Sequence, residues 1–199
     1  MNNLNSELIY KKLKLDTLTW LSSIRNNSFD YKLSDSTESS PFTVCFALFI
    51  LDLFNLTETL DESTRKQMSK AIKDPQDEKT GLFLPPNFTS STVSKLPFQL
   101  TAFSLSALAI LNEKPKYPIK ILDNYNSIET LKSYLDNQKC NEGKSGSGNM
   151  AMFMAIFLTY ELNTIKNGKE LLESWFDYHN SNQNQITGFW GENWGKGNL

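Results

Sequence analysis

Glu192 stands between Trp190 and Trp194 in the stretch GFWGENWG, and this grouping suits a sugar ligand. A carboxylate can bind or exchange a proton with a hydroxyl group, and an aromatic ring can pack against the apolar face of a sugar. A solvated acid in a polar segment is the simpler interpretation. His179, the single histidine, could act as a general base near neutral pH. The simpler interpretation is a histidine near a helix C-terminus that interacts with the helix dipole. No catalytic residue is therefore assigned.

Cysteine and charge content indicate no metal, no other cofactor and no nucleic-acid partner. Cys45 lies in an apolar run and Cys140 in a polar loop, so they form neither a disulfide framework nor a metal-binding cluster. They favour a reducing compartment, and the start of the chain lacks the apolar core of a signal peptide. We therefore expect a cytoplasmic protein. The 20 basic and 22 acidic residues give a net charge of −2 without a basic block, which argues against nucleic-acid binding.

Three apolar segments at similar intervals predict buried helices. They read SPFTVCFALFILDLFN, LPFQLTAFSLSALAILN and GNMAMFMAIFLTYELN. Each is apolar on nearly all sides, as is typical of a helix buried on several sides. The longest apolar runs fall short of the ~20 residues that span a bilayer, so no membrane span is expected. Pro41 and Pro97 fit the first turns of their helices, and Ser147 or Asn149 is expected to cap the third.

A second, amphipathic helix follows each apolar one. The segments DESTRKQMSKAIKD, SIETLKSYLDN and GKELLESWFDYH carry apolar residues at the spacing of a helix with one buried face, and Ser127 is expected to cap the second. The sequence therefore predicts an all-α fold with three helical-hairpin repeats over residues 41–199. An amphipathic helix over residues 1–27 and a polar linker over residues 28–40 precede them. The apolar residues of that helix available for packing are Leu8, Ile9, Leu13, Trp20, Leu21 and Ile24.

The loops after the first and third amphipathic helices share the pattern Gln-x4-Gly-x-aromatic. Its residues are Gln76, Gly81 and Phe83 in the first copy and Gln183, Gly188 and Trp190 in the second. We expect the glycine to adopt a positive φ after the helix and the glutamine amide to bond free backbone groups at the helix end. The aromatic ring can cover that amide. These residues are therefore assigned a structural role.

This repeated turn, with a buried helix between copies, resembles the QW motif of terpenoid cyclases and their prenyltransferase relatives. The resemblance covers roughly residues 41–191 and implies an α/α toroid of concentric inner and outer helices. The chain is also similar to the N-terminal half of longer bacterial helical proteins associated with polysaccharide synthesis, through TGLF, LTAFSLSALAIL, GSGNMAMFMAIF and TGFWG. The Asp-x-Asp-Asp, Asp-Asp-x-x-Asp and Asp-x-Cys motifs of the cyclases and prenyltransferases are absent from the sequence. Their chemistry is therefore not expected here.

Three hairpins are too few to close a toroid, so we expect an incomplete toroid, either a fragment or a half that self-associates or pairs with a second half-toroid. If the buried helices ring a cavity, their N-terminal ends bring polar side chains to its mouth. The side chains expected to line such a cavity are Gln99, Thr101, Ser147, Asn149 and Glu192.

Two functions follow as hypotheses. The chain is the N-terminal part of a cavity enzyme that acts on a glycan or an isoprenoid, or it is a non-catalytic helical scaffold or binding module. The enzyme hypothesis predicts a deep polar pocket with two carboxylates, or with one acid beside His179. The scaffold predicts a filled or shallow centre and an exposed apolar edge.

Overall fold

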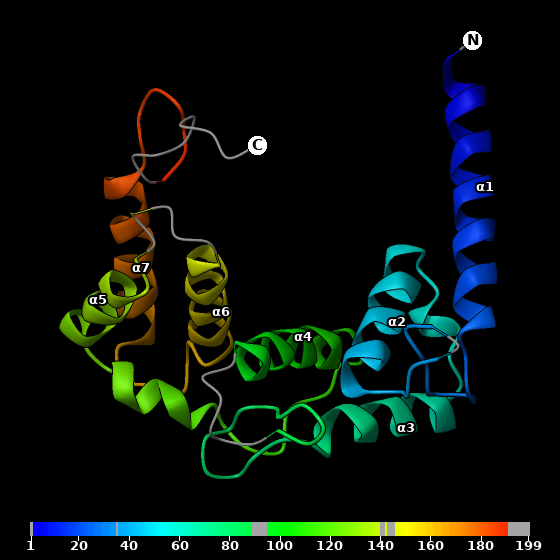
Figure 1. Cartoon of the computed structure of the whole chain (residues 1–199), viewed down its shortest axis with the longest axis horizontal. Coiled ribbons are helices and arrows are strands. Elements are labelled where there is room, and N and C mark those ends of the chain that lie inside the picture. Colours follow the sequence, from blue (N-terminus) through cyan, green and yellow to red (C-terminus); the bar gives the residue numbers. More distant parts are fainter. Residues whose placement is uncertain (1, 35, 89–94, 140–141, 143–145, 191–199) are drawn as a thin grey trace. The chain divides into compact units, whose positions relative to one another are not determined.

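The computed structural model describes residues 2–34, 36–88, 95–139, 142 and 146–190. Within these residues the protein is all-α, as predicted, and the only extended pairings are single backbone bridges (Figure 1). The chain divides into two compact units. The first comprises Met1–Gln76, Phe83–Thr92 and Phe103–Lys116, and the second comprises Asp77–Leu82, Val93–Ala102 and Tyr117–Leu199. Helix α4 (Leu96–Ile110) contributes its first half to the second unit and its second half to the first.

The other helices of the first unit are α1 (Asn2–Ser23), α2 (Pro41–Leu53), the 3₁₀ helix η1 (Thr57–Thr59) and α3 (Glu62–Lys73). Ser40 caps α2 in a capping box with Thr43, and Pro41 occupies the first turn, as predicted. Helix α2 packs against α3 and η1. The core of the unit is apolar and includes Val44, Leu48, Met68, Ile72, Leu105 and Leu108.

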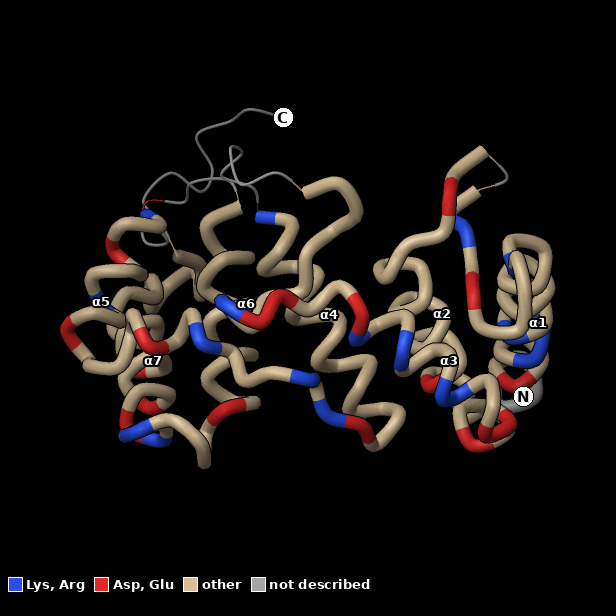
Figure 2. Tube along the Cα trace, turned by 90° about the horizontal axis from the view of Figure 1, so that it is seen from below, with Lys and Arg blue, Asp and Glu red and all other residues tan. Residues whose placement is uncertain are grey.

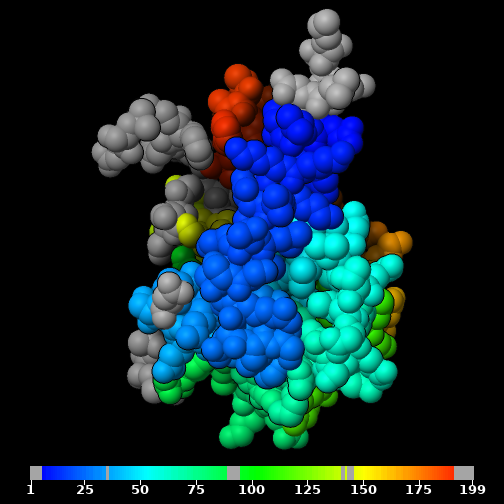
Figure 3. Space-filling view, turned by 90° about the vertical axis from the view of Figure 1, so that its right-hand side faces the viewer, coloured from blue at the N-terminus to red at the C-terminus, as the bar shows by residue number. Residues whose placement is uncertain are grey.

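Helix α1 ends at Ser23, short of the predicted residue 27, and buries little of its apolar surface. Leu21 is buried, but Leu8, Ile9 and Leu13 are 58 to 68% exposed. These three side chains, which the sequence makes available for packing, are therefore not buried against the described part of the chain. Figure 3 shows α1, in blue, at the surface of the first unit.

The second unit contains the 3₁₀ helix η2 (Lys120–Tyr125), α5 (Ile128–Asn137), α6 (Ser147–Tyr160) and α7 (Gly168–Asn182). Helices α5 and α6 both pack against α7, and α5 also packs against η2. Three side chains bind these helices together. Trp175 Nε1 donates to the Ala151 carbonyl at 3.1 Å, the Tyr178 hydroxyl donates to Asp136 at 2.6 Å, and the Tyr134 hydroxyl donates to the Met150 carbonyl at 3.3 Å.

The helix caps of the second unit agree only in part with the sequence. Ser127 caps α5 in a capping box with Thr130, as predicted. The N-cap of α6 is instead Gly146, at a φ of 76°, so the expected cap at Ser147 or Asn149 is wrong. Ser147 is the first residue of the helix and is buried, and Asn149 is exposed.

Charge follows helix type. Helices α4 and α6 contain no charged residue, whereas α3, α5 and α7 carry charges of both signs, as Figure 2 shows. This is the pattern expected of buried helices that alternate with half-exposed ones along the chain. The toroidal arrangement itself stays a prediction.

Candidate apolar binding pocket

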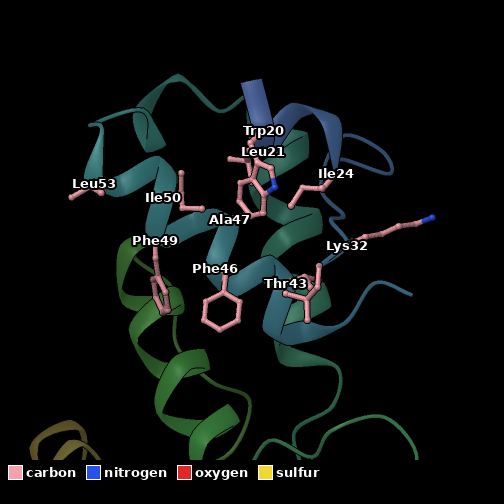
Figure 4. A pocket seen from close by; sticks show the side chains of 11 residues that line it. Trp20, Leu21, Ile24, Lys32, Thr43, Phe46, Ala47, Phe49, Ile50 and Leu53 are labelled. Carbon is pink, nitrogen blue, oxygen red and sulfur yellow. The ribbon is translucent and has the colours of Figure 1, made fainter. Parts of the chain in front are cut away.

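A pocket of about 340 Å³ lies in the first unit between the end of α1, the segment after it and α2. Figure 4 shows the Trp20 indole near Ala47, with Ile24 beside it and the Lys32 side chain extending away from the others. The lining residues are almost all apolar. They are Trp20, Leu21, Ile24, Lys32, Leu33, Thr43, Phe46, Ala47, Phe49, Ile50 and Leu53.

Helix α2 supplies one wall because its lining residues recur at helical spacing. Thr43, Ala47 and Ile50 stand at positions i, i+4 and i+7, on one face of the helix. Phe46 and Phe49 are held by ring contacts to Phe103 of α4, with centroids 5.5 and 6.0 Å apart. Edge-on ring contacts of this kind fix the orientation of the two phenylalanines.

The segment after α1 supplies the opposite wall and is tied to α2 by Thr43. The backbone reverses so that Lys32 N donates to the Ile24 carbonyl at 2.9 Å. Tyr31, which the sequence placed in a polar linker, is buried, and its carbonyl accepts a 2.7 Å hydrogen bond from Thr43 Oγ1. Burial raises the pKa of Tyr31, and the nearby Arg25 partly opposes that rise. The wall is thus fixed by hydrogen bonds in which the lining residues Ile24, Lys32 and Thr43 take part.

The chemistry of the pocket is that of apolar contact. Lys32 is the one charged lining residue, and the Thr43 hydroxyl already donates to Tyr31. No carboxylate, histidine or cysteine lines the pocket. Phe46 is 38% exposed and Leu53 is 71% exposed, so the pocket opens to solvent over an apolar edge. An apolar molecule would bury this surface, whereas a sugar would find almost no hydrogen-bonding partners.

The sequence-predicted lining residues lie elsewhere. Gln99 and Thr101 are in the first half of α4, and Ser147 and Asn149 are at the start of α6, all within the second unit. Thr101 is fully buried and donates to the Pro97 carbonyl at 2.6 Å, so its hydroxyl has a structural role. None of the four lines the pocket. Glu192 lies outside the described residues.

Two further cavities lie in the second unit, with volumes of about 280 and 660 Å³. The first contains the carboxylate of Asp177 and the second that of Glu129. Neither cavity brings two carboxylates together, and neither includes His179. The pairs expected of a catalytic cavity are therefore not found in these three pockets.

The pocket was not predicted from the sequence, because an apolar segment such as α2 was expected to be buried on several sides. The usable signal was the aromatic spacing in PFTVCFALF, which places Phe42, Phe46 and Phe49 along adjoining turns. An all-apolar helix that is exposed on one side presents a binding surface there.

The two Gln-x4-Gly-x-aromatic turns have the predicted backbone. We name residues 76–83 turn A and residues 183–190 turn B. Gly81 and Gly188 have φ values of 75° and 72°. A backbone bridge joins the first and last residues in each, Gln76 to Phe83 and Gln183 to Trp190. The two glycines and the two bridges thus give both turns the same backbone pattern.

An Asx side chain and a threonine complete both turns, and the sequence analysis missed them. In turn A, Asp77 accepts from Thr80 N at 2.8 Å, and in turn B, Asn184 accepts from Thr187 N at 2.9 Å. Alignment of the two copies as Gln-Asx-x-x-Thr-Gly-x-aromatic would have found them. An Asx side chain that bonds the backbone three residues later stabilises a turn locally.

Each turn also has a hydrogen bond to the side chain of its glutamine. Gln76 Oε1 accepts from Lys116 N at 2.8 Å, in a later segment of the chain. Gln183 Nε2 donates within its own turn, to the Gly188 carbonyl at 2.7 Å. Trp190 Nε1 donates to the His179 carbonyl at 2.7 Å, which anchors turn B to α7.

Among the described residues, no group of three or more His, Cys, Asp and Glu side chains could hold a metal ion. No helix in that part of the chain has the length and apolar character to cross a membrane. Comparison of the chain with protein-family models, with curated proteins and with solved structures finds no match.

Proposed function

We propose that this chain is a non-catalytic helical binding module whose pocket holds the apolar part of a small molecule, such as an isoprenoid chain. The observation that carries the proposal is the lining of the pocket between α1 and α2, where ten of the eleven side chains are uncharged and nine of those are apolar. Its volume of about 340 Å³ lies in the range of small-molecule sites.

The lining also separates the two ligand classes that the sequence suggested. A glycan needs several hydrogen-bonding groups in its site, because unpaired buried hydroxyls are costly. The polar groups of the pocket are the Thr43 hydroxyl, which already donates to the Tyr31 carbonyl, and the amine of Lys32. An isoprenoid chain needs only apolar contact, and Lys32 suits an anionic head group. The pocket therefore favours the isoprenoid class.

Titration with N-phenyl-1-naphthylamine, which fluoresces in apolar surroundings, tests the proposal. The variant Phe46→Glu places a charge in the pocket wall at a position that already has solvent access. The matched control is Phe176→Glu, since Phe176 is 52% exposed on α7 and lines none of the three pockets. We expect wild type and Phe176→Glu to bind the probe alike, and Phe46→Glu to bind it at least about tenfold more weakly.

Competition then identifies the ligand class. Farnesol should displace the probe from the wild-type protein, and maltotriose should not. Equal probe binding by Phe46→Glu and wild type, or displacement by the oligosaccharide alone, would contradict the proposal.

A further inference from the structure

We infer that turn B is a docking site for an extended, proline-containing peptide segment supplied by a partner protein. The chain itself provides the reason, because turn A has the same backbone and already holds such a segment. Residues 116–121, with the sequence KYPIKI, cover turn A. We name this segment the strap.

Backbone hydrogen bonds hold the strap on turn A. Ile121 N donates to the Thr80 carbonyl at 3.0 Å, and Lys116 N donates to Gln76 Oε1 at 2.8 Å. Lys120 Nζ donates to the Glu78 carbonyl at 2.9 Å. Turn A thus forms hydrogen bonds with the strap backbone at Lys116 and Ile121 and with one lysine side chain. They require an extended segment rather than a particular long sequence.

Close approach at Gly81 fixes the register of the strap. A Cβ atom at Gly81 would lie 1.9 Å from the Pro118 carbonyl oxygen, so only glycine permits this contact. The next residue, Ile119, is 2% exposed, and its N–H donates to the buried Glu161 carboxylate at 3.0 Å. Within turn A, Leu82 and Phe83 are 6% and 0% exposed.

Among the residues that the structure describes, no segment covers Gly188 of turn B as the strap covers Gly81. A Cβ atom at Gly188 would meet nothing within 4 Å. Phe189 and Trp190 are 46% and 37% exposed, whereas their counterparts in turn A are buried. The Gln183 amide nitrogen donates to the Gly188 carbonyl at 2.7 Å, and this bond uses a different atom from the oxygen with which Gln76 receives the strap. Thr187 supplies the carbonyl that corresponds to that of Thr80.

Turn B is also preorganised for binding. Its internal hydrogen bonds, from Asn184 N to the Phe189 carbonyl and from Gly188 N to the Asn184 carbonyl, are 2.9 and 2.8 Å long. The equivalent bonds of turn A, Asp77 N to Leu82 O and Gly81 N to Asp77 O, are both 2.8 Å long. A rigid site of this kind loses little conformational entropy when a peptide binds. The occupant is therefore a segment with the chemistry of the strap: a proline, then a branched apolar residue, then a lysine.

A labelled peptide with the strap sequence, KPKYPIKILD (residues 114–123), tests the inference by fluorescence anisotropy with the full-length chain. The blocking variant is Gly188→Asn, which adds a side chain where the strap approaches turn A most closely. Asparagine accepts the required backbone, because Asn55, Asn87 and Asn112 of this chain have φ values of 54 to 59°. The matched control is Ile186→Asn, since Ile186 is 95% exposed and its counterpart Lys79 stays exposed although the strap is seated.

We expect wild type and Ile186→Asn to bind the peptide alike and Gly188→Asn to bind it at least about tenfold more weakly. A peptide with Ile119→Asp should not bind. Unchanged tryptophan emission and an unchanged far-UV circular dichroism spectrum of Gly188→Asn would show that the variant is folded. A loss of peptide binding would then be due to the side chain added at turn B. The inference is overturned if both asparagine variants bind alike, or if wild type does not bind. A dimer of the free protein that the peptide dissociates would overturn it in favour of a second copy as the occupant.

Discussion

His179 lies among aromatic rings near the end of α7. The ring centroids of Trp175, Tyr178 and Trp190 are 4.2, 5.3 and 6.2 Å from that of the imidazole. Its Nε2 atom is buried and has no hydrogen-bond partner among the described residues, and burial lowers its pKa. A neutral imidazole packed in this way supports α7 and turn B. The interaction of a charged histidine with the helix dipole, expected from the sequence, does not fit a lowered pKa.

The lowered pKa of His179 predicts a pH-dependent stability. Below the ordinary histidine pKa of 6.5, His179 of the unfolded chain binds a proton that His179 of the folded chain does not. The contribution of neutral His179 to the free energy of unfolding is therefore fully present above pH 6.5 and decreases as the pH falls below that value. Urea unfolding between pH 7.5 and 5 measures this effect. The variant His179→Phe should show a flatter profile. A wild-type midpoint that rises as the pH is lowered would contradict the prediction.

Cys45 is fully buried in α2, and burial raises the pKa of its thiol to about 12. Because the thiolate is the reactive form, we expect Cys45 to resist Ellman's reagent until the protein unfolds. The measurement uses the Cys140→Ser variant, so that one thiol is counted. Rapid reaction of that thiol in the native protein would show that α2 opens readily.

At the scale of elements, turns A and B offer a comparison within one chain. They share a backbone and internal hydrogen bonds, and they differ in whether a strap covers them. The same substitution at equivalent positions of the two turns therefore distinguishes two losses of stability. One is caused by strain in the turn backbone, and the other by displacement of the strap.

Gly81→Ala should destabilise the protein more than Gly188→Ala. Both introduce a side chain at a positive φ, which costs about 1–2 kcal/mol. Only Gly81→Ala also collides with the Pro118 carbonyl, and such overpacking adds about 1–3 kcal/mol. Urea unfolding monitored by circular dichroism measures the difference. Equal losses in the two variants would mean that the strap contributes nothing to stability at turn A.

How far the sequence predicts the elements depends on how local their causes are. The capped helix starts at Ser40 and Ser127 and the glycine turns were predictable, because residues within one or two turns determine them. The exposure of Leu8 and Leu13 and the seat of the strap were not, because they depend on which distant segments pack there.

The candidate site was harder to predict than the fold. The prediction that Gln99 and Asn149 line a cavity assumes that polar side chains at the ends of the buried helices face one shared cavity. The pocket instead depends on the reversal that brings Lys32 back to Ile24, which seals one wall against α2. The segment that contains Tyr31 is mostly polar, so its sequence does not predict this reversal of the backbone.

At the scale of the whole molecule, the two proposed binding sites lie in different compact units. The first carries the apolar pocket, and the second carries turn B. We therefore propose two binding surfaces of different chemistry for this chain, one for an apolar small molecule and one for an extended peptide. Self-association, or pairing with a second half-toroid, stays a separate prediction.

Methyl NMR with isoleucine δ1 labelling tests the central claim most directly, because it locates an apolar ligand by residue. Farnesol should shift the signals of Ile24 and Ile50, which line the pocket, and leave Ile72 and Ile165, which do not, in place. The Phe46→Glu variant should lose these shifts. Shifts of equal size at all four methyl groups, or no shift at Ile24 and Ile50, would contradict the assignment of this pocket as the binding site.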